Sequence, residues 1–472
     1  MSPHTKLIVN DIHSQLNPTT VAEIISIDSL AAIQVIVHRA AQQGQVICIA
    51  GGRHAMGAQQ FGRGAVLVDT TRLNRVLGFD PAAGLIEVEA GIQWPELIGY
   101  LIEAQKETPW PQQWGIAQKQ TGADRLSIGG SLAANVHGRG LRMRPIIADV
   151  ESFVLVDAQG EVRTCSRQEN SELFRLVSGG YGLFGLVYSV KLRLVPRQKV
   201  ERVVEIINID TLIPAFEQRL EAGFLYGDFQ FSTNEQSDDF LRRGVFSCYH
   251  PVNPTAPLLE SQKELSEKDW SQLFYLSHAN KAQAFRQYAN YYLSTSGQVY
   301  GSDTHQLSTY LDDYHRALDQ KLGATERATE VITEIYVPRL ALPDFMAEVR
   351  ADFRANGVNV IYGTIRLIET DTESFLAWAK QPYACTIFNL HTVHTPQGIE
   401  HSAAAFRRLI DMAIRRGGSY FLTYHKYATR QQVETCYPQF PEFLHLKQQY
   451  DPAERFQSDW YRHYREMFAD VL

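Results

Sequence analysis

The sequence predicts an α+β protein with two main domains and a helical C-terminal segment. Up to about residue 197, short apolar strands alternate with a few helices and many glycine-rich turns. Beyond that point glycine becomes rarer, and period-two strand patterns alternate with longer helical patterns. We therefore expect domains at residues 1–197 and 198–428, followed by a segment at residues 429–472 that packs back on the first domain.

The first domain is predicted to begin with a helix that leads into short strands. Residues 29–43 place apolar side chains on one face, with Ser29 as the N-cap and Gly44 at the end. Apolar runs and a period-two pattern predict three strands, and another stretch predicts the next helix. These elements are expected at residues 46–50, 65–69, 84–91 and 94–104.

The rest of the first domain is predicted to contain a hairpin, a short helix and a strand. Residues 151–166 alternate on either side of a turn at 158–160, as a β-hairpin does. Asn170 is expected to cap the short helix that follows. Residues 186–195 form the last predicted strand, which a proline ends.

The second domain is predicted to be an antiparallel sheet covered by helices. Alternating patterns at residues 331–337 and 358–368 indicate strands. Residues 344–356 and 404–416 have the pattern of helices that pack on such a sheet. The segment at 429–472 is rich in aromatic residues and is expected to be helical.

Charge and composition exclude some classes of partner. The formal net charge is −7, and no run of Lys and Arg resembles a nucleic-acid-binding patch. A surface of this charge does not favour broad binding to nucleic acid or to anionic lipid. We therefore expect a protein that binds a small molecule and no nucleic acid.

Targeting and cysteine patterns predict a cytoplasmic location. The first 20 residues lack the apolar core of a signal peptide, and no apolar stretch approaches the ~18 residues of a membrane span. The five cysteines form no C-x-x-C pair, as is usual in a reducing compartment. We expect no integral membrane segment and no metal site, while attachment to a membrane surface through loops or a partner is compatible with the sequence.

A G-x-G-x-x-G match at residues 180–185 does not predict a Rossmann fold. In that fold the glycines follow a strand and open a helix, whose N-terminus meets the pyrophosphate. Here a predicted helix precedes the glycines and a predicted strand follows them. The glycines are therefore expected to allow a tight loop with positive φ angles.

Two other glycine-rich loops point to a bound ligand. The loop at residues 50–59 follows a buried strand, and its paired glycines let backbone N–H groups approach an anion such as a pyrophosphate. The loop at residues 121–140 consists largely of small residues and leaves room for a flat ligand. Either loop alone is also compatible with a close-packed turn, but their order and spacing are specific.

The order of these loops and strands closely resembles the FAD-binding domain of the vanillyl-alcohol oxidase and p-cresol methylhydroxylase superfamily. The resemblance covers about residues 15–197 and includes A-G-G-R-H-A, S-I-G-G-S-L-A-A-N-V-H-G and G-L-F-G-L-V. It implies a PCMH-type FAD-binding domain of two subdomains, with the pyrophosphate wrapped by backbone. It implies FAD contacts at Ala50, Gly51, Gly52, Arg53, His54, Ala55, Gln59, Thr121, Asp124, Ser127, Gly129, Gly130, Asn135, His137, Gly138 and Val187.

The resemblance also implies a covalent flavin. In many relatives the histidine that matches His54 is bonded to the flavin 8α-methyl group within a G-H-S pattern, which is R-H-A in this chain. The histidine is present and the serine after it is replaced by Ala55. Some relatives attach the flavin a second time through a cysteine in the later loop, and residues 121–140 contain none. A single bond through His54 is therefore expected.

The C-terminal region resembles the sugar-oxidising branch of this superfamily, which includes aldonolactone, alditol and decaprenylphosphoryl-ribose oxidases. The resemblance covers residues 417–426, 437–438 and 450–459, although the spacing that leads to Lys426 is longer here. It implies an active-site role for Lys426. The aldonolactone oxidases carry an E-x-R motif where this chain has T-I-R ending at Arg366, so the missing glutamate argues against gulono- or arabinono-lactone.

Taken with this resemblance, the sequence predicts an FAD-dependent oxidoreductase acting on a CH–OH group of a sugar, polyol or lactone. Lys426 or His425 is expected to take the hydroxyl proton, and Arg366 to hold a hydroxyl, a carboxylate or the developing alkoxide. Glu334 is expected on a strand facing the flavin, and Tyr424 is a further catalytic candidate. Oxygen or another acceptor would reoxidise the FAD.

Two alternatives remain open at the level of sequence. The loop around His54 also resembles that of flavin dehydrogenases acting on a hydroxy acid or on an amine such as a cytokinin. A flavin-binding protein without turnover would show the same two loops.

Overall fold

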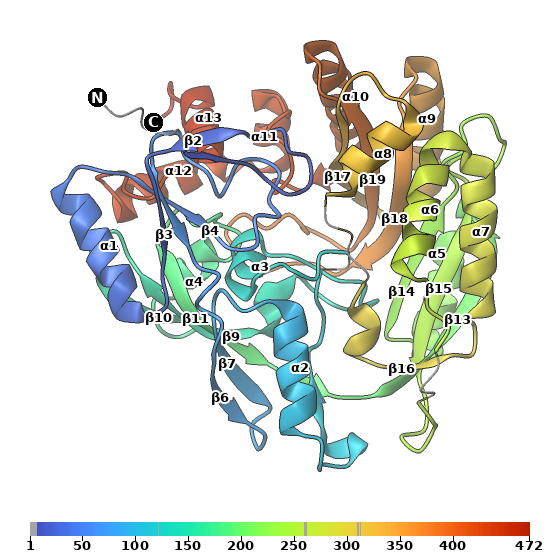
Figure 1. Ribbon diagram of the computed structural model, residues 1–472, viewed down its shortest axis with the longest axis horizontal. Coiled ribbons are helices and arrows are strands. Elements are labelled where there is room, and N and C mark those ends of the chain that lie inside the picture. Colours follow the sequence, from blue (N-terminus) through green and yellow to red (C-terminus); the bar gives the residue numbers. More distant parts are fainter. Residues whose placement is uncertain (1–6, 121, 259–261, 309–310, 312) are drawn as a thin grey trace.

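The computed structural model describes residues 7–120, 122–258, 262–308, 311 and 313–472. Figure 1 shows two lobes side by side, one formed by the N-terminal third and the C-terminal helices, the other by the middle of the chain. An eight-stranded sheet forms the second lobe, and smaller sheets form the first. The predicted α+β class is confirmed.

A three-stranded parallel sheet begins the first lobe. Its order is β3-β5-β4, with β3 at Glu23–Ser26, β5 at Val66–Asp69 and β4 at Ile47–Ala50. Helix α1 (Leu30–Gln42) has Ser29 as its N-cap, where the side chain accepts a hydrogen bond from the Ala32 N–H. The hairpin of β1 (Leu7–Val9) and β2 (Thr19–Val21) lies before these strands in the chain.

A five-stranded antiparallel sheet completes the first lobe, in the order β10-β9-β11-β7-β6. The predicted hairpin is confirmed, because Val162 pairs with Val156 and Ser166 with Ser152. The strands are β6 (Val76–Asp80), β7 (Leu85–Glu89), β9 (Val150–Val156), β10 (Val162–Ser166) and β11 (Leu186–Arg193), and β8 (Trp114–Gly115) pairs separately with β12 (Val195–Pro196). The helices are α2 (Trp94–Ala104), α3 (Ile128–Ala134) and α4 (Ser171–Val177).

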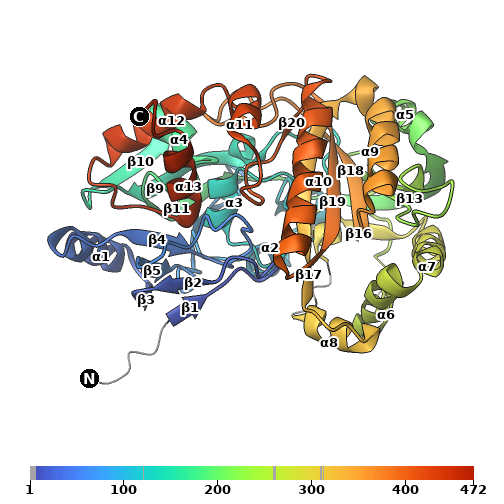
Figure 2. The same ribbon diagram turned by 90° about the horizontal axis from the view of Figure 1, so that it is seen from above.

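The second lobe is built on one antiparallel sheet with the order β16-β13-β15-β14-β18-β19-β17-β20. Helices lie on both of its sides (Figure 2). Its strands are β13 (Lys199–Asn208), β14 (Tyr226–Phe231), β15 (Arg243–Pro251), β16 (Val299–Gly301), β17 (Ala328–Pro338), β18 (Val360–Ile368), β19 (Tyr383–Val393) and β20 (Ser419–Tyr420). Its helices are α5 (Leu212–Glu221), α6 (Glu267–Ala279), α7 (Lys281–Ser294), α8 (Tyr314–Leu322), α9 (Leu342–Asn356) and α10 (Pro396–Ile414).

The two faces of this large sheet differ in chemistry. One face is apolar and packs on helices, as where Phe216 of α5 meets Phe246 with ring centroids 4.9 Å apart and Phe353 of α9 meets Phe388 at 5.4 Å. The opposite face carries buried polar residues such as Gln230, which pairs with Thr364 across β14 and β18. Period-two alternation thus places these apolar side chains on one face of the sheet and these polar side chains on the other.

The C-terminal helices α11 (Arg430–Cys436), α12 (Phe440–Tyr450) and α13 (Asp459–Met467) return to the first lobe. The Ile47 N–H donates to the Arg455 carbonyl at 2.7 Å, and the Gln457 N–H donates to the Ile47 carbonyl at 2.9 Å. Phe456 is fully buried beside Ile47 and the inner face of α1. The last segment therefore contributes to the core next to β4.

Two local predictions differ from the structure. Residues predicted as a loop at 127–134 instead form α3, since Ser127 accepts a hydrogen bond from the Gly130 N–H and starts a helix despite two glycines. Asn170 occupies the N-cap position of α4, but its side chain does not cap. Its amide donates instead to the Thr164 carbonyl at 2.7 Å, and its φ of +46° turns the chain into the helix.

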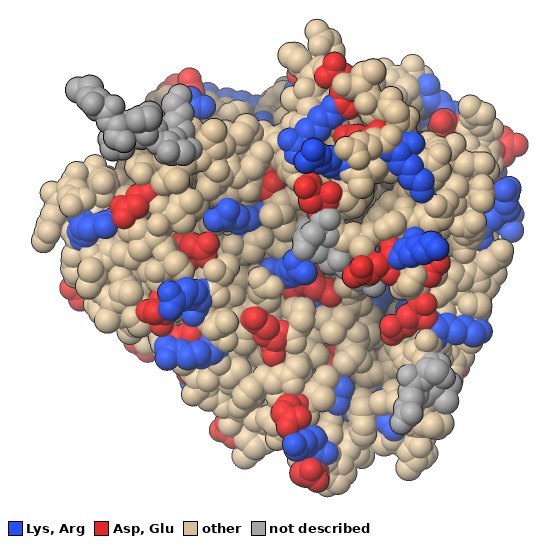
Figure 3. All heavy atoms as spheres, viewed as in Figure 1, with Lys and Arg blue, Asp and Glu red and all other residues tan. Residues whose placement is uncertain are grey.

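The surface carries both signs of charge. On the face drawn in Figure 3, lysines and arginines lie interspersed with acidic residues, and no large region of one sign is present. Among the described helices, none is both long and apolar enough to cross a membrane.

Candidate cofactor and active site

A long cavity lies where the two lobes meet. It encloses about 1390 Å³ of space free of protein atoms, its open mouth included. Segments from both lobes line it, among them the loop after β4, the start of α3, the loop before β11 and residues 421–424. Its length and its mixed walls suit a large ligand such as a dinucleotide.

The loop after β4 offers backbone N–H groups to this cavity. Arg53 has a φ of +58°, which turns the chain so that successive amides face one side. Among the hydrogen bonds of the described residues, none uses the N–H of Gly51, Gly52, Arg53 or Ala55 as its donor. Four such amides within five residues, all lining the cavity, form a concave anion site, which suits the pyrophosphate of a dinucleotide.

The glycines of this loop also allow it to lie against the start of α3. A Cβ on Gly52 would lie 2.2 Å from the Arg125 carbonyl oxygen, and one on Gly51 would lie 2.3 Å from the Ser127 hydroxyl. Both distances are far below van der Waals contact, so only glycine fits. The paired glycines thus fix the distance between the two loops that the sequence singled out.

Helix α3 lines the cavity with small residues and does not form an anion site. Its first amides are already paired, because Gly129 N–H donates to the Ala90 carbonyl at 2.7 Å and Gly130 N–H to the Ser127 hydroxyl at 3.2 Å. Gly129, Gly130 and Ala133 line the cavity without side chains that protrude. A flat aromatic ring system can therefore lie close to the helix.

The loop at residues 179–185 forms another part of the cavity wall. Positive φ angles occur at Gly179, Tyr181, Gly182 and Gly185, which confirms the predicted tight loop. Tyr181, Gly182 and Gly185 also line the cavity, together with Val187 of β11. The G-x-G-x-x-G match at this loop is therefore not a Rossmann fingerprint, although the loop does line the cavity.

His54 lies in the cavity wall beside a second histidine. Its Nδ1 is 2.8 Å from Nε2 of His13, so the two rings share a hydrogen bond. Burial, together with the neighbouring His13, lowers the pKa of His54 well below its usual value. Burial likewise lowers the pKa of His13 to about 4, so both rings are neutral near pH 7. A neutral imidazole is the form able to attack an electrophilic carbon.

The predicted cofactor residues divide into two groups. Ten of them line the cavity, namely Gly51, Gly52, Arg53, His54, Ala55, Gln59, Ser127, Gly129, Gly130 and Val187. Five others are close in sequence but are not part of the lining, namely Ala50, Asp124, Asn135, His137 and Gly138. Thr121 lies outside the described residues.

Asp124 and Asn135 join the two lobes. Asp124 pairs with the buried Lys119 ammonium at 2.5 Å and accepts from the Ser308 N–H at 2.8 Å. The Asn135 amide donates to Asp371 at 2.9 Å, and its oxygen accepts from the Ile147 N–H. The resemblance therefore identified important positions here, but in this structure their side chains hold segments of the chain together.

His137 and Glu334 form a buried pair at the lobe interface. His137 Nε2 is 2.5 Å from Glu334 Oε1, and both side chains are almost fully buried. Oε1 also accepts from the Tyr336 hydroxyl at 2.6 Å and from the Cys385 thiol at 3.2 Å. Oε2 accepts from the Tyr424 hydroxyl at 3.0 Å. Every acceptor of this carboxylate is thus in use.

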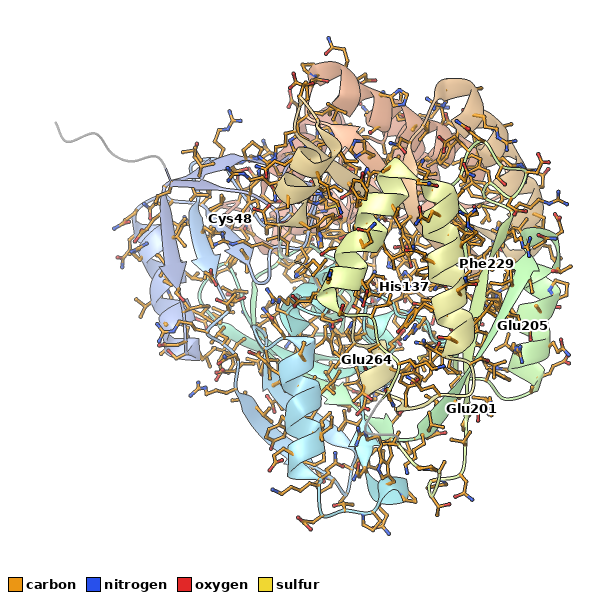
Figure 4. The ribbon with its side chains drawn as sticks, turned by 45° about the vertical axis from the view of Figure 1, so that its right-hand side comes forward. Cys48, His137, Glu201, Glu205, Phe229 and Glu264 are labelled. Atoms are coloured by element: carbon orange, nitrogen blue, oxygen red, sulfur yellow. The ribbon has the colours of Figure 1, made fainter. Side chains whose placement is uncertain are left out.

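The hydrogen bonds indicate the charge state of this pair. His137 Nδ1 is 2.9 Å from the Gly138 carbonyl, which can only accept, so Nδ1 carries a proton. Nε2 and Glu334 Oε1 share a second proton across their 2.5 Å contact. Burial favours the neutral carboxyl, but the His137 charge and the hydrogen bonds from His137 and Tyr336 lower the pKa of Glu334 to about 2, so the carboxyl is ionised near pH 7. His137 is labelled in Figure 4, near the centre of the molecule.

Tyr424 connects the pair to the cavity. Tyr424 lines the cavity, and its hydroxyl donates a hydrogen bond to Glu334. Burial and the adjacent Glu334 carboxylate raise the pKa of Tyr424 well above its usual value, so the hydroxyl keeps its proton. A protonated hydroxyl at the cavity wall is therefore linked to a buried anion behind it.

Arg366 lies on the same sheet face as Glu334. The register places Thr364, Ile387 and Glu334 in one row across β18, β19 and β17, and Arg366 two residues further along β18. Arg366 is 3% exposed, and its Nε and Nη1 have no hydrogen-bond partner among the described residues. A buried guanidinium with unused donors is costly unless a ligand pairs with it.

Further polar groups on this face are also unused. Among the described residues, no partner is found for Gln230 Oε1, Ser247 Oγ, Asp228 Oδ1 or Thr364 Oγ1. The pairings Gln230–Thr364 and Asp228–Ser247 place these side chains on the same face as Arg366. The face therefore carries several buried donors and acceptors without a partner in the described part of the chain, although none of these residues belongs to the lining of the cavity.

Lys426 and His425 do not reach the cavity. Neither residue belongs to its lining, and Lys426 Nζ is directed to the Asp459 carbonyl at 3.5 Å. The His425 ring stacks on Tyr427 with centroids 5.0 Å apart, and burial lowers the pKa of His425 to about 4. Of the catalytic candidates at residues 424–426, only Tyr424 lines the cavity. The path of residues 421–428 decides this, and the sequence pattern alone does not give that path.

Sequence reasoning missed other residues of the site. His13, Tyr336, Cys385 and Lys119 lie far apart in sequence and belong to no local motif. Ile332 and Phe421 close the cavity from the second lobe. Alternation along β17 offered one signal, because Ile332, Glu334 and Tyr336 occupy every second position and so share a face.

Comparisons with known proteins agree with the geometry. A family model described as "FAD binding domain" matches residues 21–166. Cytokinin dehydrogenase 9 of Oryza sativa subsp. japonica is 22% identical over 85% of this chain and 77% of its own length. D-arabinono-1,4-lactone oxidase of Yarrowia lipolytica is 29% identical over 39% of this chain and 34% of its own.

Cytokinin dehydrogenase 10 of Oryza sativa subsp. japonica is 30% identical over 48% of this chain, and the chain spans 42% of its length. Most of these similarities thus concern less than half of each relative. The region that the family model matches contains the loop after β4, α3 and the predicted hairpin. Residues 21–166 therefore match an FAD binding domain, and the chain resembles FAD-binding oxidoreductases with a PCMH-type domain.

Proposed function

We propose that the protein oxidises a CH–OH group of a hydroxyl-rich substrate, such as a sugar, polyol or lactone, with FAD in the long cavity. The observation that carries this proposal is the polar sheet face around Arg366, whose unused donors and acceptors lie next to the Tyr424–Glu334–His137 chain. When bound, FAD would accept the hydride, and oxygen or another acceptor would reoxidise it.

The residues around the cavity fit FAD. The unpaired amides of Gly51, Gly52, Arg53 and Ala55 would hold the pyrophosphate, and the glycine wall of α3 would lie against the ring system. The loop that contains Tyr181 and Gly182 would hold the remainder of the dinucleotide. No metal or nucleotide-specific side chain is needed for this arrangement.

The chain Tyr424–Glu334 provides a path for the substrate proton. As the C–H bond breaks, the substrate hydroxyl would give its proton to Tyr424 Oη, and Tyr424 would pass its own proton to Glu334 Oε2. His137 beside Glu334 would keep the carboxylate ionised and in place, with Oε2 facing the Tyr424 hydroxyl. Arg366 would hold a neighbouring hydroxyl or the ring oxygen through Nε and Nη1.

Oxidation of an amine is a second candidate, favoured by the match of cytokinin dehydrogenase 9 along 85% of this chain. The two candidates place different demands on the polar face. A substrate with several hydroxyl groups would satisfy Gln230, Thr364 and Arg366, whereas a mostly apolar amine would leave them unpaired at a cost of about 1–3 kcal/mol each.

A reduction assay under anaerobic conditions tests the proposal. We expect the purified protein to be yellow, and its visible flavin absorbance to bleach with polyols, aldoses or lactones but not with isoprenoid adenines or hydroxy acids. Replacement of Tyr424 by Phe should slow the bleaching by about 10²-fold or more, because the proton path is lost. Bleaching by amines alone would contradict the assignment to alcohols, and a protein that binds no FAD would contradict the whole proposal.

A covalent bond between His54 and the flavin is a separate proposal. It rests on the neutral His54 ring in the cavity wall and on the histidine that relatives have at this position. We expect flavin fluorescence to stay with the polypeptide after acid denaturation, and to separate from it in His54→Ala. His38→Ala, which changes an exposed histidine on α1, is the matched control. Free flavin from the unaltered protein would exclude the bond without affecting the fold.

A further inference from the structure

Three histidines gather around the carboxylate of Glu330, outside the cavity described above. Glu330 lies on β17, four residues before Glu334 and on the same face of the sheet. His278 comes from α6, His315 from α8 and His391 from β19, so the cluster joins three separate elements. Figure 1 shows α8 beside β17 and α6 beside β18.

The two oxygens of Glu330 have different surroundings. Oε1 is 3.3 Å from His278 Nε2. Oε2 accepts from the Tyr314 hydroxyl at 2.6 Å and lies 3.0 Å from His315 Nδ1. The side chains of His278, Glu330 and His315 are all more than nine-tenths buried. One oxygen is therefore held by donors, while the other faces an imidazole.

His391 has no role in this hydrogen-bond network. One ligand atom each of His278, Glu330 and His391 lies within 4.8 Å of the others. Nδ1 of His391 is buried and has no hydrogen-bond partner among the described residues. The His278 and His391 rings meet edge to face, with centroids 4.9 Å apart. Hydrogen bonding to Glu330 explains His278 and His315 but leaves His391 unexplained.

We propose that His278, Glu330 and His391 bind a divalent transition metal of the zinc class. Two imidazoles and one carboxylate are a common ligand set for Zn²⁺, and a water or substrate atom usually completes the four-coordinate shell. Ligand atoms about 2.0–2.1 Å from a tetrahedral zinc lie roughly 3.3 Å apart. The separation of 3.3 Å between His278 Nε2 and Glu330 Oε1 matches that spacing.

The surroundings of the site support a metal-binding carboxylate. Ligating carboxylates are themselves usually held by hydrogen bonds, and Tyr314 and His315 do this for Oε2. The metal would fasten α6 to β17 and β19. A small second cavity next to Glu330 shares His13 and Ile332 with the cofactor cavity, so the metal would also stabilise the wall between the two.

Zinc binding to the flavin-loaded protein tests this inference. The protein is treated with chelator, dialysed, loaded with Zn²⁺ alone and freed of excess metal, and the bound zinc is measured by mass spectrometry and titration calorimetry. We expect about one zinc per chain, with a rise in Tm that chelator reverses. His391→Asn and His278→Asn should each weaken zinc binding at least about tenfold.

A second buried cluster provides the matched control. His137, Glu334 and Cys385 also bring three ligand atoms within 4.8 Å of one another, but strong hydrogen bonds already satisfy that carboxylate. Cys385→Ser should therefore leave zinc binding unchanged. Circular dichroism and flavin content of each variant report whether it is folded. The inference is overturned if the unaltered protein binds no zinc, if folded His391→Asn binds it equally well, or if Cys385→Ser loses it.

Discussion

Replacing Glu334 with Gln is expected to lower the rate of flavin reduction by about 10²-fold or more, the range of a lost acid–base step. In the proposed mechanism the carboxylate accepts the proton that Tyr424 passes on, and an amide cannot take that proton. The hydroxyl of Tyr424 remains in place, so the Kd for substrate should stay within about threefold. Stopped-flow reduction with a substrate from the polyol panel separates the two quantities.

The low pKa of Glu334, about 2, adds a second expectation. The carboxylate is ionised throughout the neutral range, so ionisation of Glu334 should cause no change in the rate between pH 5 and pH 9. Cys385→Ser is a suitable control, because a serine hydroxyl can still donate to Oε1. A Gln variant that reduces its flavin within about threefold of the unaltered rate would show that Tyr424 passes its proton elsewhere.

Much of the first lobe was predictable because its signals are local. The predicted helix at residues 94–104 coincides with α2, and the hairpin at 151–166 has the expected pairing. Capping and alternation depend on neighbours within a few residues, which a single sequence displays. The start of α3 was not predicted, since two glycines weigh against a helix and the Ser127 cap only outweighs them in the folded context.

A family resemblance predicted the cofactor loops. The active site was predictable only in part. Gly51, Gly52 and Gly129 line the cavity as expected. Two segments of backbone can approach each other this closely only where one of them has a glycine. The base was assigned to Lys426 and His425, whereas the structure brings Tyr424 to the cavity. Contacts such as His137 with Glu334 span 197 positions, and no local pattern encodes which strand faces which loop.

Adding one methyl group at Gly52 is expected to remove most of the FAD. In Gly52→Ala the new Cβ would lie 2.2 Å from the Arg125 carbonyl oxygen, which is backbone and cannot rotate away. The loop after β4 must then move away from the segment before α3, and the amides of Gly51 to Ala55 would lose their alignment on the pyrophosphate. We expect FAD affinity to fall at least about tenfold, equivalent to about 1.4 kcal/mol, measured as flavin absorbance per polypeptide at limiting FAD.

Two further variants separate this effect from a general loss of folding. Gly99→Ala in α2 adds a Cβ with no atom within 4 Å, and should retain its FAD while gaining about 0.5–1 kcal/mol of stability. Gly51→Ala meets chiefly the Ser127 hydroxyl at 2.3 Å, so pairing it with Ser127→Gly should recover part of the flavin. No such partner exists for Gly52, because its obstacle is the Arg125 backbone. Full FAD content in a folded Gly52→Ala protein would mean that the loop does not hold the pyrophosphate.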